Sequence, residues 1–405
     1  MNVPQPLSPP STASPNGSVF EIFRAFLRLG LTSFGGPIAH IAYFRTEFVE
    51  RRRWLNEAAY ADLVALCQFL PGPASSQVGI GLGLMRGGVP GSVAAWLGFT
   101  LPSACALTVF ALALGQLGAW TGPWLHGLKV VAVAVVAQAL WGMGKTLCPD
   151  ARRASIAILA AAVIAFVPGA LTQLVVIVVA AVVGWLWLVP SSSLPHAPFG
   201  VRISRRTGVT VLLSFAAIVT ALPFLAPHGG HAWQLFEAFF RTGSLVFGGG
   251  HVVLPLLQEL TVQPGWVSAD EFLAGYGAAQ AVPGPLFTFA AFLGAATHQE
   301  PAGWTGAALA TLAIFLPSFF YVIGALPLWE GLRRHPGMQK AMLAINAAVV
   351  GLLLAAFYNP VWTGAIHSAR DFALAGIAYL ALTFWKWPPW LVVLLCAAAT
   401  GFGWR

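Results

Sequence analysis

The sequence CQFLPGPASSQ, residues 67–77, interrupts a stretch that otherwise has the composition of a membrane helix. Proline lacks a backbone donor and restricts the residue before it, so Pro71, Gly72 and Pro73 leave carbonyl groups without helical partners. Inside a bilayer such a break is tolerated only where the backbone is buried in protein or lines a wet cavity. The stretch therefore predicts a broken or re-entrant helix whose second part begins after Pro73.

The composition of the whole chain is that of an integral membrane protein. Its 405 residues are 58% hydrophobic and 8% charged, with a mean hydropathy of +0.77, whereas about 25% of the residues in a soluble domain are charged. Apolar runs of about 20 residues recur from Val19 onwards, long enough to cross a hydrocarbon core about 30 Å thick. Because these runs are continuous and do not alternate, we expect an all-α polytopic fold and not a β-barrel.

Charge and cysteine usage exclude several other classes. The net charge of +8 does not indicate nucleic-acid binding, because most Lys and Arg residues lie in short loops between apolar spans, where they orient a membrane protein. The four cysteines are isolated, so neither a disulfide framework nor a zinc site is expected. Residues 1–18 are rich in Pro and Ser and uncharged, which predicts a disordered N-terminal tail. We predict no cofactor and no bound metal.

The chain aligns with itself, which indicates an internal repeat. Residues 23–36 match residues 236–249 at eight of fourteen positions, including an FGG motif in each. At a shift of 212 residues, Trp54 matches Trp266, and the first PGP turn (residues 71–73) matches a second PGP turn (residues 283–285). Each half then has an FGG segment, a PGP segment and four ordinary apolar spans, and one extra span near 207–226 separates the halves.

An odd span between two halves that each cross an even number of times turns the second half upside down. This is the inverted-topology design of many secondary transporters. We predict a first repeat over 19–189, a cytoplasmic linker with one connecting span over 190–230, and a second, inverted repeat over 231–405. The FGG and PGP motifs are expected to break their helices.

Charge distribution favours hairpins over full crossings at these motifs, because cytoplasmic loops collect Lys and Arg. Hairpins place the arginine-rich loop 45–57 inside and give fifteen basic residues inside and two outside, whereas full crossings give eleven and six. We expect a multi-pass protein of the bacterial inner membrane with a cytoplasmic N-terminus and a periplasmic C-terminus.

The breaks form the predicted substrate site, since free amides at a helix start suit an anion. Arg28 and Arg241 hold equivalent repeat positions, and their donor forks suit a tetrahedral dianion. Helix packing or kinks remain the alternative for the Gly and Pro residues, and snorkelling remains the alternative for both arginines. The predicted substrate-binding residues are Arg28, Gly35, Gly36, Gln68, Pro71, Gly72, Pro73, Ser75, Ser76, Arg241, Gly248, Gly249, Gln280, Pro283, Gly284, Pro285 and Thr288.

Four residues near the breaks are candidates for proton coupling. They are His40, Asp62, His251 and Glu259. Histidine titrates near physiological pH, and carboxylates lie on both faces of the predicted topology. A histidine satisfied at a helix end and a carboxylate solvated in a loop remain the alternative explanations.

Four long motifs allow a comparison with known families. They are FGGPIAHIAYFRTEFVERRRWLNEAAYADLVALCQFLPGPASSQ (34–77), FGGGHVVLPLL (247–257), GWVSADEFL (265–273) and QAVPGPLFTFAAFLGA (280–295). With these motifs the chain resembles the chromate ion transporter family in its long two-domain form, from Phe23 onwards. The resemblance implies export of chromate from the bacterial cytoplasm, driven by the proton gradient or the membrane potential, with sulfate as a structural analogue.

We therefore expect a secondary transporter of chromate and not an enzyme. A transporter of another oxyanion such as sulfate is the nearest alternative. A membrane-bound oxidoreductase is a different class, but the sequence has no nucleotide, flavin or iron–sulfur motif. The expected partners are chromate or a similar oxyanion and the lipid bilayer, while protons and a second copy of the chain stay open.

Overall fold

The computed structural model describes residues 18–34, 36–117, 122–167, 170–189, 203–246, 253–329 and 335–402, and these residues form helices and turns without a strand. Four predicted site residues, Gly35, Gly248, Gly249 and His251, lie outside the described residues. So do residues 1–17 of the predicted tail and residues 190–202 of the predicted linker.

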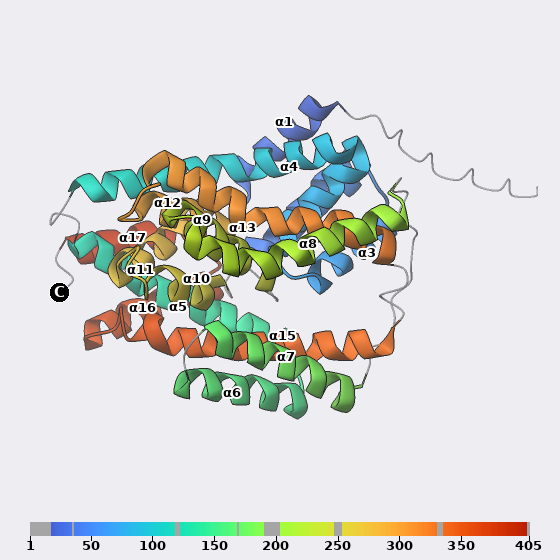
Figure 1. The fold of residues 1–405 in the computed structure, drawn as a ribbon. Helices are drawn as coiled ribbons and strands as arrows, with labels where there is room; N and C mark the ends of the chain where they lie inside the picture. Colours follow the sequence, from blue (N-terminus) through green and yellow to red (C-terminus); the bar gives the residue numbers. More distant parts are fainter. Residues whose placement is uncertain are drawn as a thin grey trace, which may run out of the picture.

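The described residues form the helices shown in Figure 1. The first half contains α1 (Val19–Thr32), α2 (Gly36–Phe44), α3 (Glu57–Phe69), α4 (Ala74–Leu117), α5 (Gly122–Leu147), α6 (Ala151–Phe166) and α7 (Ala170–Trp187). The connecting helix is α8 (Arg205–Leu225). The second half contains α9 (His231–Leu245), α10 (Val253–Thr261), α11 (Ala269–Ala279), α12 (Phe289–Ala296), α13 (Gly303–Ala325), α15 (Pro336–Ala356), α16 (Ala369–Thr383) and α17 (Pro389–Gly401).

Both PGP turns separate two helical segments, as predicted. The first lies between α3 and α4, and α4 begins at Ala74, directly after Pro73. The second lies between α11 and a 3₁₀ turn (Leu286–Thr288) that leads into α12. Because 44 residues at 1.5 Å each would span about twice the hydrocarbon core, α4 cannot be one crossing. It bends at Gly87 and Gly88, where the backbone leaves the helical region.

The first half brings three separate points of the chain to one end of the molecule. Glu21, at the start of α1, lies 3.5 Å from Arg52 and 3.9 Å from Arg86. The guanidinium groups of Arg52 and Arg86 lie over the Trp54 ring, 5.7 and 5.4 Å from its centroid. The chain therefore leaves this end and returns to it twice, once through each break. This is the hairpin arrangement that the charge distribution favours.

The arginine-rich loop at this end is held by ion pairs. Arg51 and Arg52 donate to Glu47 at 3.1 and 2.6 Å, within a π-helix over residues 45–51. Burial raises the pKa of Glu47, but the hydrogen bonds from the two arginines outweigh that effect and lower the pKa overall. The carboxylate therefore stays ionised at neutral pH and keeps the loop compact.

The second half repeats this arrangement with different chemistry. The rings of His231, at the start of α9, and Trp266 lie 4.7 Å apart, and His231 Nε2 lies 3.3 Å from Oγ1 of Thr297 after α12. Trp266 is the repeat equivalent of Trp54. In Figure 1, α3 lies toward the right-hand end and α11 toward the left-hand end. Such an arrangement is consistent with an inverted repeat, and the inversion stays a prediction.

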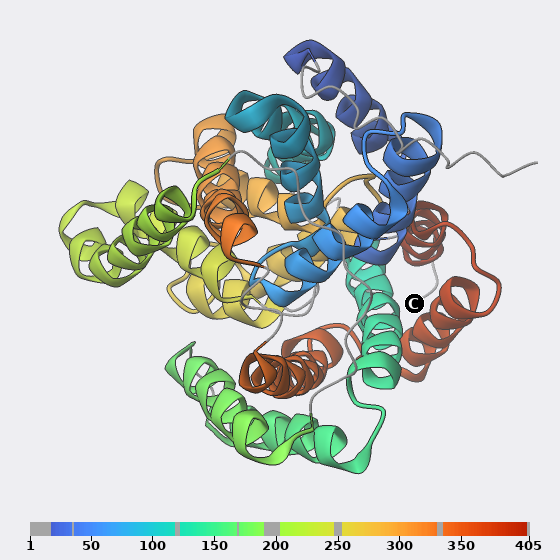
Figure 2. The same cartoon turned by 90° about the vertical axis from the view of Figure 1, so that its right-hand side faces the viewer.

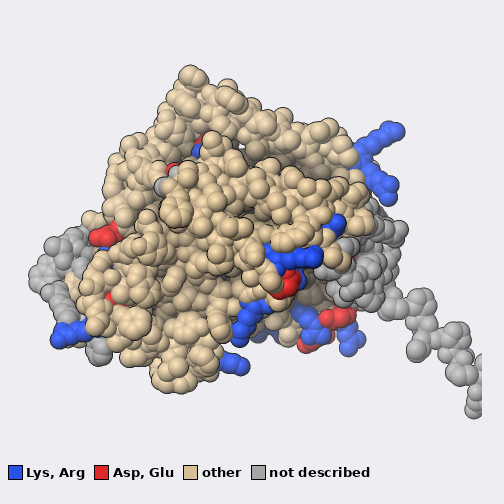
Figure 3. Space-filling model, turned by 90° about the horizontal axis from the view of Figure 1, so that it is seen from below, with Lys and Arg blue, Asp and Glu red and all other residues tan. Residues whose placement is uncertain are grey.

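Long helices surround the broken segments. Within the described residues, five helices are long and apolar enough to cross a membrane: Ala74–Gly115, Pro123–Leu147, Arg205–His228, Gly303–Leu328 and Pro336–Trp362. Helix α8 lies at one edge of the bundle and α16 and α17 at the opposite edge (Figure 2). Most of the face seen from below carries no charged side chain (Figure 3). The protein is a multi-pass membrane protein.

Two helix pairs pack at glycines in repeat-equivalent positions. Helix α1 packs along α4, and α9 packs along α13. A Cβ atom added at Gly30 would lie 2.7 Å from the carbonyl oxygen of Gly98 and 2.8 Å from that of Phe99. A Cβ atom added at Gly243 would collide with the carbonyl oxygen of Ile314. Close backbone approach at small residues is a common way to join membrane helices.

We expect Gly30→Ala and Gly243→Ala to lower the melting temperature of the purified protein, because the added methyl group meets backbone that cannot rotate away. Overpacking of this kind costs about 1–3 kcal/mol. Gly142→Ala is the matched control, since a Cβ atom there has no neighbour within 4 Å. Tryptophan fluorescence during heating in detergent measures the effect, and equal melting temperatures for all three variants would contradict the packing.

Candidate functional site

Each PGP turn is hydrogen-bonded to the other half of the protein. The backbone N–H of Gly72 donates to the carbonyl of Val246 at 2.5 Å, and the N–H of Gly284 donates to the carbonyl of Ser33 at 2.9 Å. Ser33 and Val246 cap the C-termini of α1 and α9, the helices that precede the two FGG motifs. The two bonds are equivalent under the repeat, and each satisfies a carbonyl at a helix end.

Glycine is required at the centre of both turns. Gly72 has φ +111° and Gly284 has φ +103°, a region that other residues rarely adopt. A Cβ atom at Gly72 would lie 3.2 Å from Oγ of Ser318, and one at Gly284 would lie 2.8 Å from Oγ of Ser103. These serines belong to the repeated Leu-Pro-Ser motifs of α4 and α13. Each turn is thus pressed against the Leu-Pro-Ser helix of the opposite half.

His40 joins the first FGG segment to the first PGP segment. Its Nε2 lies 3.2 Å from the carbonyl oxygen of Ser33, and its Nδ1 lies 3.4 Å from Oγ of Ser75. Because a carbonyl only accepts, Nε2 donates, and a neutral imidazole then accepts from the Ser75 hydroxyl. The carbonyl oxygen of Ser33 therefore accepts from both the Gly284 N–H and Nε2 of His40. The structure brings together three predicted site residues, His40, Ser75 and Gly284, around one carbonyl.

Buried polar atoms without partners gather around the same breaks. Five such atoms have no hydrogen-bond partner among the described residues: Oγ of Ser33, Ser76 and Ser318, Oε1 of Gln77 and Nε2 of Gln280. Nearly all buried polar groups in proteins are hydrogen-bonded, and an unpaired one costs about 1–3 kcal/mol. The three serine hydroxyls and Nε2 of Gln280 can donate to a small polar ligand, whereas Oε1 of Gln77 can only accept.

Gln77 supplies a contact that the sequence analysis did not assign. Its Nε2 donates to the carbonyl of Pro71 at 2.5 Å and so satisfies backbone that the turn leaves open. Gln68, which was predicted to bind substrate or cap the break, is exposed on α3. Thr288 is buried and donates to the carbonyl of Pro285 at 2.7 Å. Asp62, a proton-coupling candidate, is buried on α3.

One cavity of about 240 Å³ opens beside these breaks. Gly36, Gln280 and Gly284 line it, together with Gln138 of α5 and Lys386 of the turn between α16 and α17. Residues of both halves therefore share one hollow. Gly36, Gln280 and Gly284 were predicted from the sequence as site residues, whereas Gln138 and Lys386 were not.

The two predicted arginines lie elsewhere. Arg241 and Glu259 line a separate cavity of about 540 Å³ near the end of α8. Arg241 pairs with the buried Glu237 one turn before it, at 2.9 Å. Arg28 is exposed on α1, and its guanidinium has no hydrogen-bond or ion-pair partner among the described residues. An anion at Arg241 would have to compete with Glu237.

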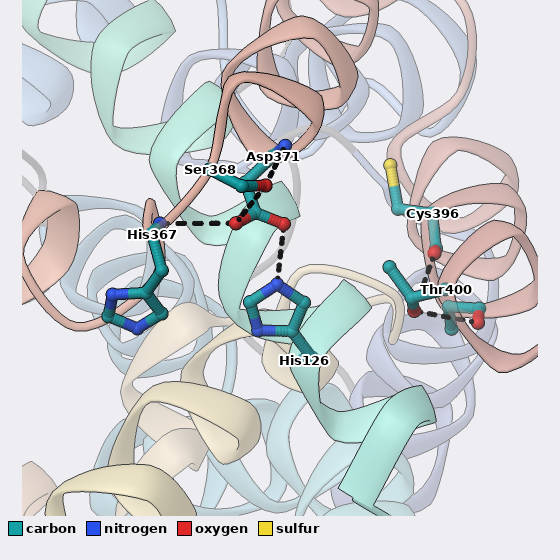
Figure 4. Close-up of polar contacts among 7 residues, drawn as sticks. His126, His367, Ser368, Asp371, Cys396 and Thr400 are labelled. Atoms are coloured by element: carbon teal, nitrogen blue, oxygen red, sulfur yellow. Dashed lines mark hydrogen bonds and ion pairs between the residues drawn. The ribbon is translucent and has the colours of Figure 1, made fainter. Parts of the chain in front are cut away.

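An ion pair between the halves was not predicted. His126 of α5 donates from Nε2 to Oδ1 of Asp371 at 2.6 Å (Figure 4). Oδ2 of Asp371 accepts from the His367 backbone at 3.1 Å and from Oγ of Ser368 at 2.9 Å. The sequence SARD over residues 368–371 has the spacing of an N-terminal helix cap. A partner 245 residues away leaves no local signal.

Comparison with known proteins gives one family. A family model described as "Chromate transporter" matches residues 20–185 and 233–402. A protein of Pseudomonas aeruginosa named "Chromate transport protein" is 28% identical, covering 99% of this chain and 93% of its own. A "Probable chromate transport protein" of Synechococcus elongatus is 26% identical, covering 96% of this chain and 97% of its own. An "Uncharacterized transporter" of Bacillus subtilis is 29% identical, covering 90% of its own chain and 40% of this one. No solved structure matches.

We expect the His126–Asp371 pair to stabilise the contact between α5 and α16. In a double-mutant cycle with His126→Asn and Asp371→Asn, the coupling should lie at about 0.5–3 kcal/mol, as for residues in direct contact. Unfolding in mixed micelles measures it. The matched pair is His298 and Glu271, 3.3 Å apart with side chains 54% and 32% exposed, where exposure limits coupling to about 0–1 kcal/mol. Additive effects of the two substitutions at His126 and Asp371 would refute the role.

Proposed function

Because the chain belongs to the chromate transporter family, we propose that it exports chromate from the cytoplasm across the bacterial inner membrane. The N-terminus would lie in the cytoplasm and the C-terminus in the periplasm. The single observation that best supports a transport site is the group of unpaired buried donors where the PGP turn of one half meets the helix end of the other. A passing oxyanion would accept from these donors.

The proposed site lies at the breaks in both halves. Pro71, Gly72 and Pro73 with Ser75 and Ser76 would supply one wall. Gly36, Gln280, Pro283, Gly284, Pro285 and Thr288 would supply the other. Helix α4 starts at this point, and the positive end of its dipole suits a negative charge. Gly35, Gly248 and Gly249 remain part of the proposal from the sequence alone, as does Gln68.

Energetics allow the membrane potential to drive export. Moving one charge through 100 mV is worth about 2.3 kcal/mol. Expelling a dianion from a negative interior therefore gains about 4.6 kcal/mol, or about three decades of concentration ratio. Proton antiport would add to this, and His40, Asp62, Glu259 and His251 are the proposed carriers. His40 is the most direct of them, because it touches Ser33 and Ser75 at the break.

Everted vesicles test the direction and the coupling. We expect chromate to accumulate inside them, and we expect accumulation to fall when valinomycin with potassium collapses the potential. If nigericin, which collapses the pH gradient, lowers accumulation as well, protons are coupled. No accumulation by the wild-type protein would overturn export. Excess sulfate distinguishes a chromate transporter from the nearest alternative, a general oxyanion carrier. In a general carrier, sulfate would compete with chromate and lower chromate uptake.

The arginine assignment is tested in the same assay. If Arg28 and Arg241 bind the anion, Arg28→Gln and Arg241→Gln should each abolish chromate accumulation while the amount of protein in the membrane is unchanged. Arg206→Gln is the matched control, because Arg206 is exposed in the first turn of α8. Normal transport by both variants would remove the two arginines from the site.

A further inference from the structure

Lys386 is a basic residue without an assigned role, and it lines the cavity beside the second PGP turn. Six of its lining residues bear on the argument: Gly36, Gln138, Gln280, Gly284, Lys386 and Trp387. Lys386 is the one charged residue among the described residues that line this cavity. Its ammonium group has no carboxylate partner among the described residues.

The sequence places Lys386 among the basic residues that orient the protein, on a cytoplasmic loop between two full spans. The structure differs because α16 has 15 residues and α17 has 13. At 1.5 Å per residue these helices are about 22 and 20 Å long, short of a core about 30 Å thick. The turn between them lies beside the break in the second half, where Lys386 lines the cavity with Gln280 and Gly284.

The turn that carries Lys386 is held in place from both sides. Trp387 N–H donates to the Ala381 carbonyl at 3.0 Å, and Nε2 of Gln138 donates to the Leu382 carbonyl at 3.0 Å. Lys386 has φ +55°, a left-handed conformation uncommon for a residue with a side chain. Such conformations cluster at functional sites, where surrounding contacts impose them.

The polar groups of the cavity are suited to an anion. Nε2 of Gln280 is buried and has no acceptor among the described residues. Lys386, which is exposed, and Gln280 thus line one hollow with no carboxylate among its described lining residues. The corresponding connection in the first half, residues 167–170, reads VPGA and carries no charge. Of the two equivalent connections, only the one in the second half therefore carries a lysine.

We propose that Lys386 binds the transported oxyanion in this cavity, with Gln280 as a second donor and Gln138 as a positioning residue that holds the turn. The inference rests on the proposed function, since it names a residue that determines the affinity of the same site. Lys386 supplies a point charge and three donors, which an oxyanion accepts without a fixed geometry.

The test is the initial rate of chromate uptake into everted vesicles as a function of chromate concentration. Loss of a charge-assisted hydrogen bond weakens binding by about ten- to a hundredfold. We expect Lys386→Gln to raise KM by about that factor, and Lys386→Arg to stay close to the wild type. Gln280→Leu should also raise KM, and the double variant should show less than the product of the two effects.

Lys145→Gln is the matched control, because it removes a lysine charge at the end of α5, where Lys145 lies over the Trp141 ring at 4.4 Å and outside the cavity. Its KM should not change. Protein level in the vesicles is measured for each variant, and Lys386→Met replaces Lys386→Gln if the latter does not reach the membrane.

The outcomes separate the two proposals. Wild-type vesicles that take up no chromate would refute export itself. Active wild-type vesicles together with an unchanged KM in Lys386→Gln would refute the role of Lys386 and leave export standing. An equal rise of KM in Lys386→Gln and Lys145→Gln would mean that lysine charge acts through membrane orientation or lipid headgroups, which also refutes the proposed site.

Discussion

The structure depends on two backbone hydrogen bonds that join each PGP turn to the helix end of the other half. A chain in lipid cannot leave amides and carbonyls unpaired. Gly72 and Gly284 supply the N–H groups, and Val246 and Ser33 supply the carbonyls. Each half thus satisfies a break in the other. The two halves are thus tied together where the substrate site is proposed.

The two halves share the same backbone hydrogen bonds but carry different side chains at equivalent positions. His40 corresponds to Val253, and Ser75 corresponds to Phe287, so the first break has an imidazole and a hydroxyl where the second has apolar groups. The Trp54 end is held by arginine and glutamate, whereas the Trp266 end is held by His231 and Thr297. Hydrogen bonds that only need backbone repeat in both halves. The imidazole of His40 and the hydroxyl of Ser75 do not, so the two breaks differ in the polar side chains that they carry.

Much of the fold could be predicted from the sequence. The PGP breaks, the FGG break in the first half and the extra helix between the halves all lie where the residue pattern placed them. These features are local, since proline and glycine act on their own backbone. The prediction that His40, Ser75 and Gly284 belong to one region also agrees with the contacts around Ser33.

The sequence by itself determined the membrane class, the repeat, the breaks and the family, because composition, periodicity and motif order are properties of the chain. Only the tertiary structure decided which polar groups meet. It paired His126 with Asp371 and brought Lys386 to the cavity beside Gln280. Hydrogen bonds and charge act over a few ångströms, and residues 245 positions apart reach that distance only once the helices have packed.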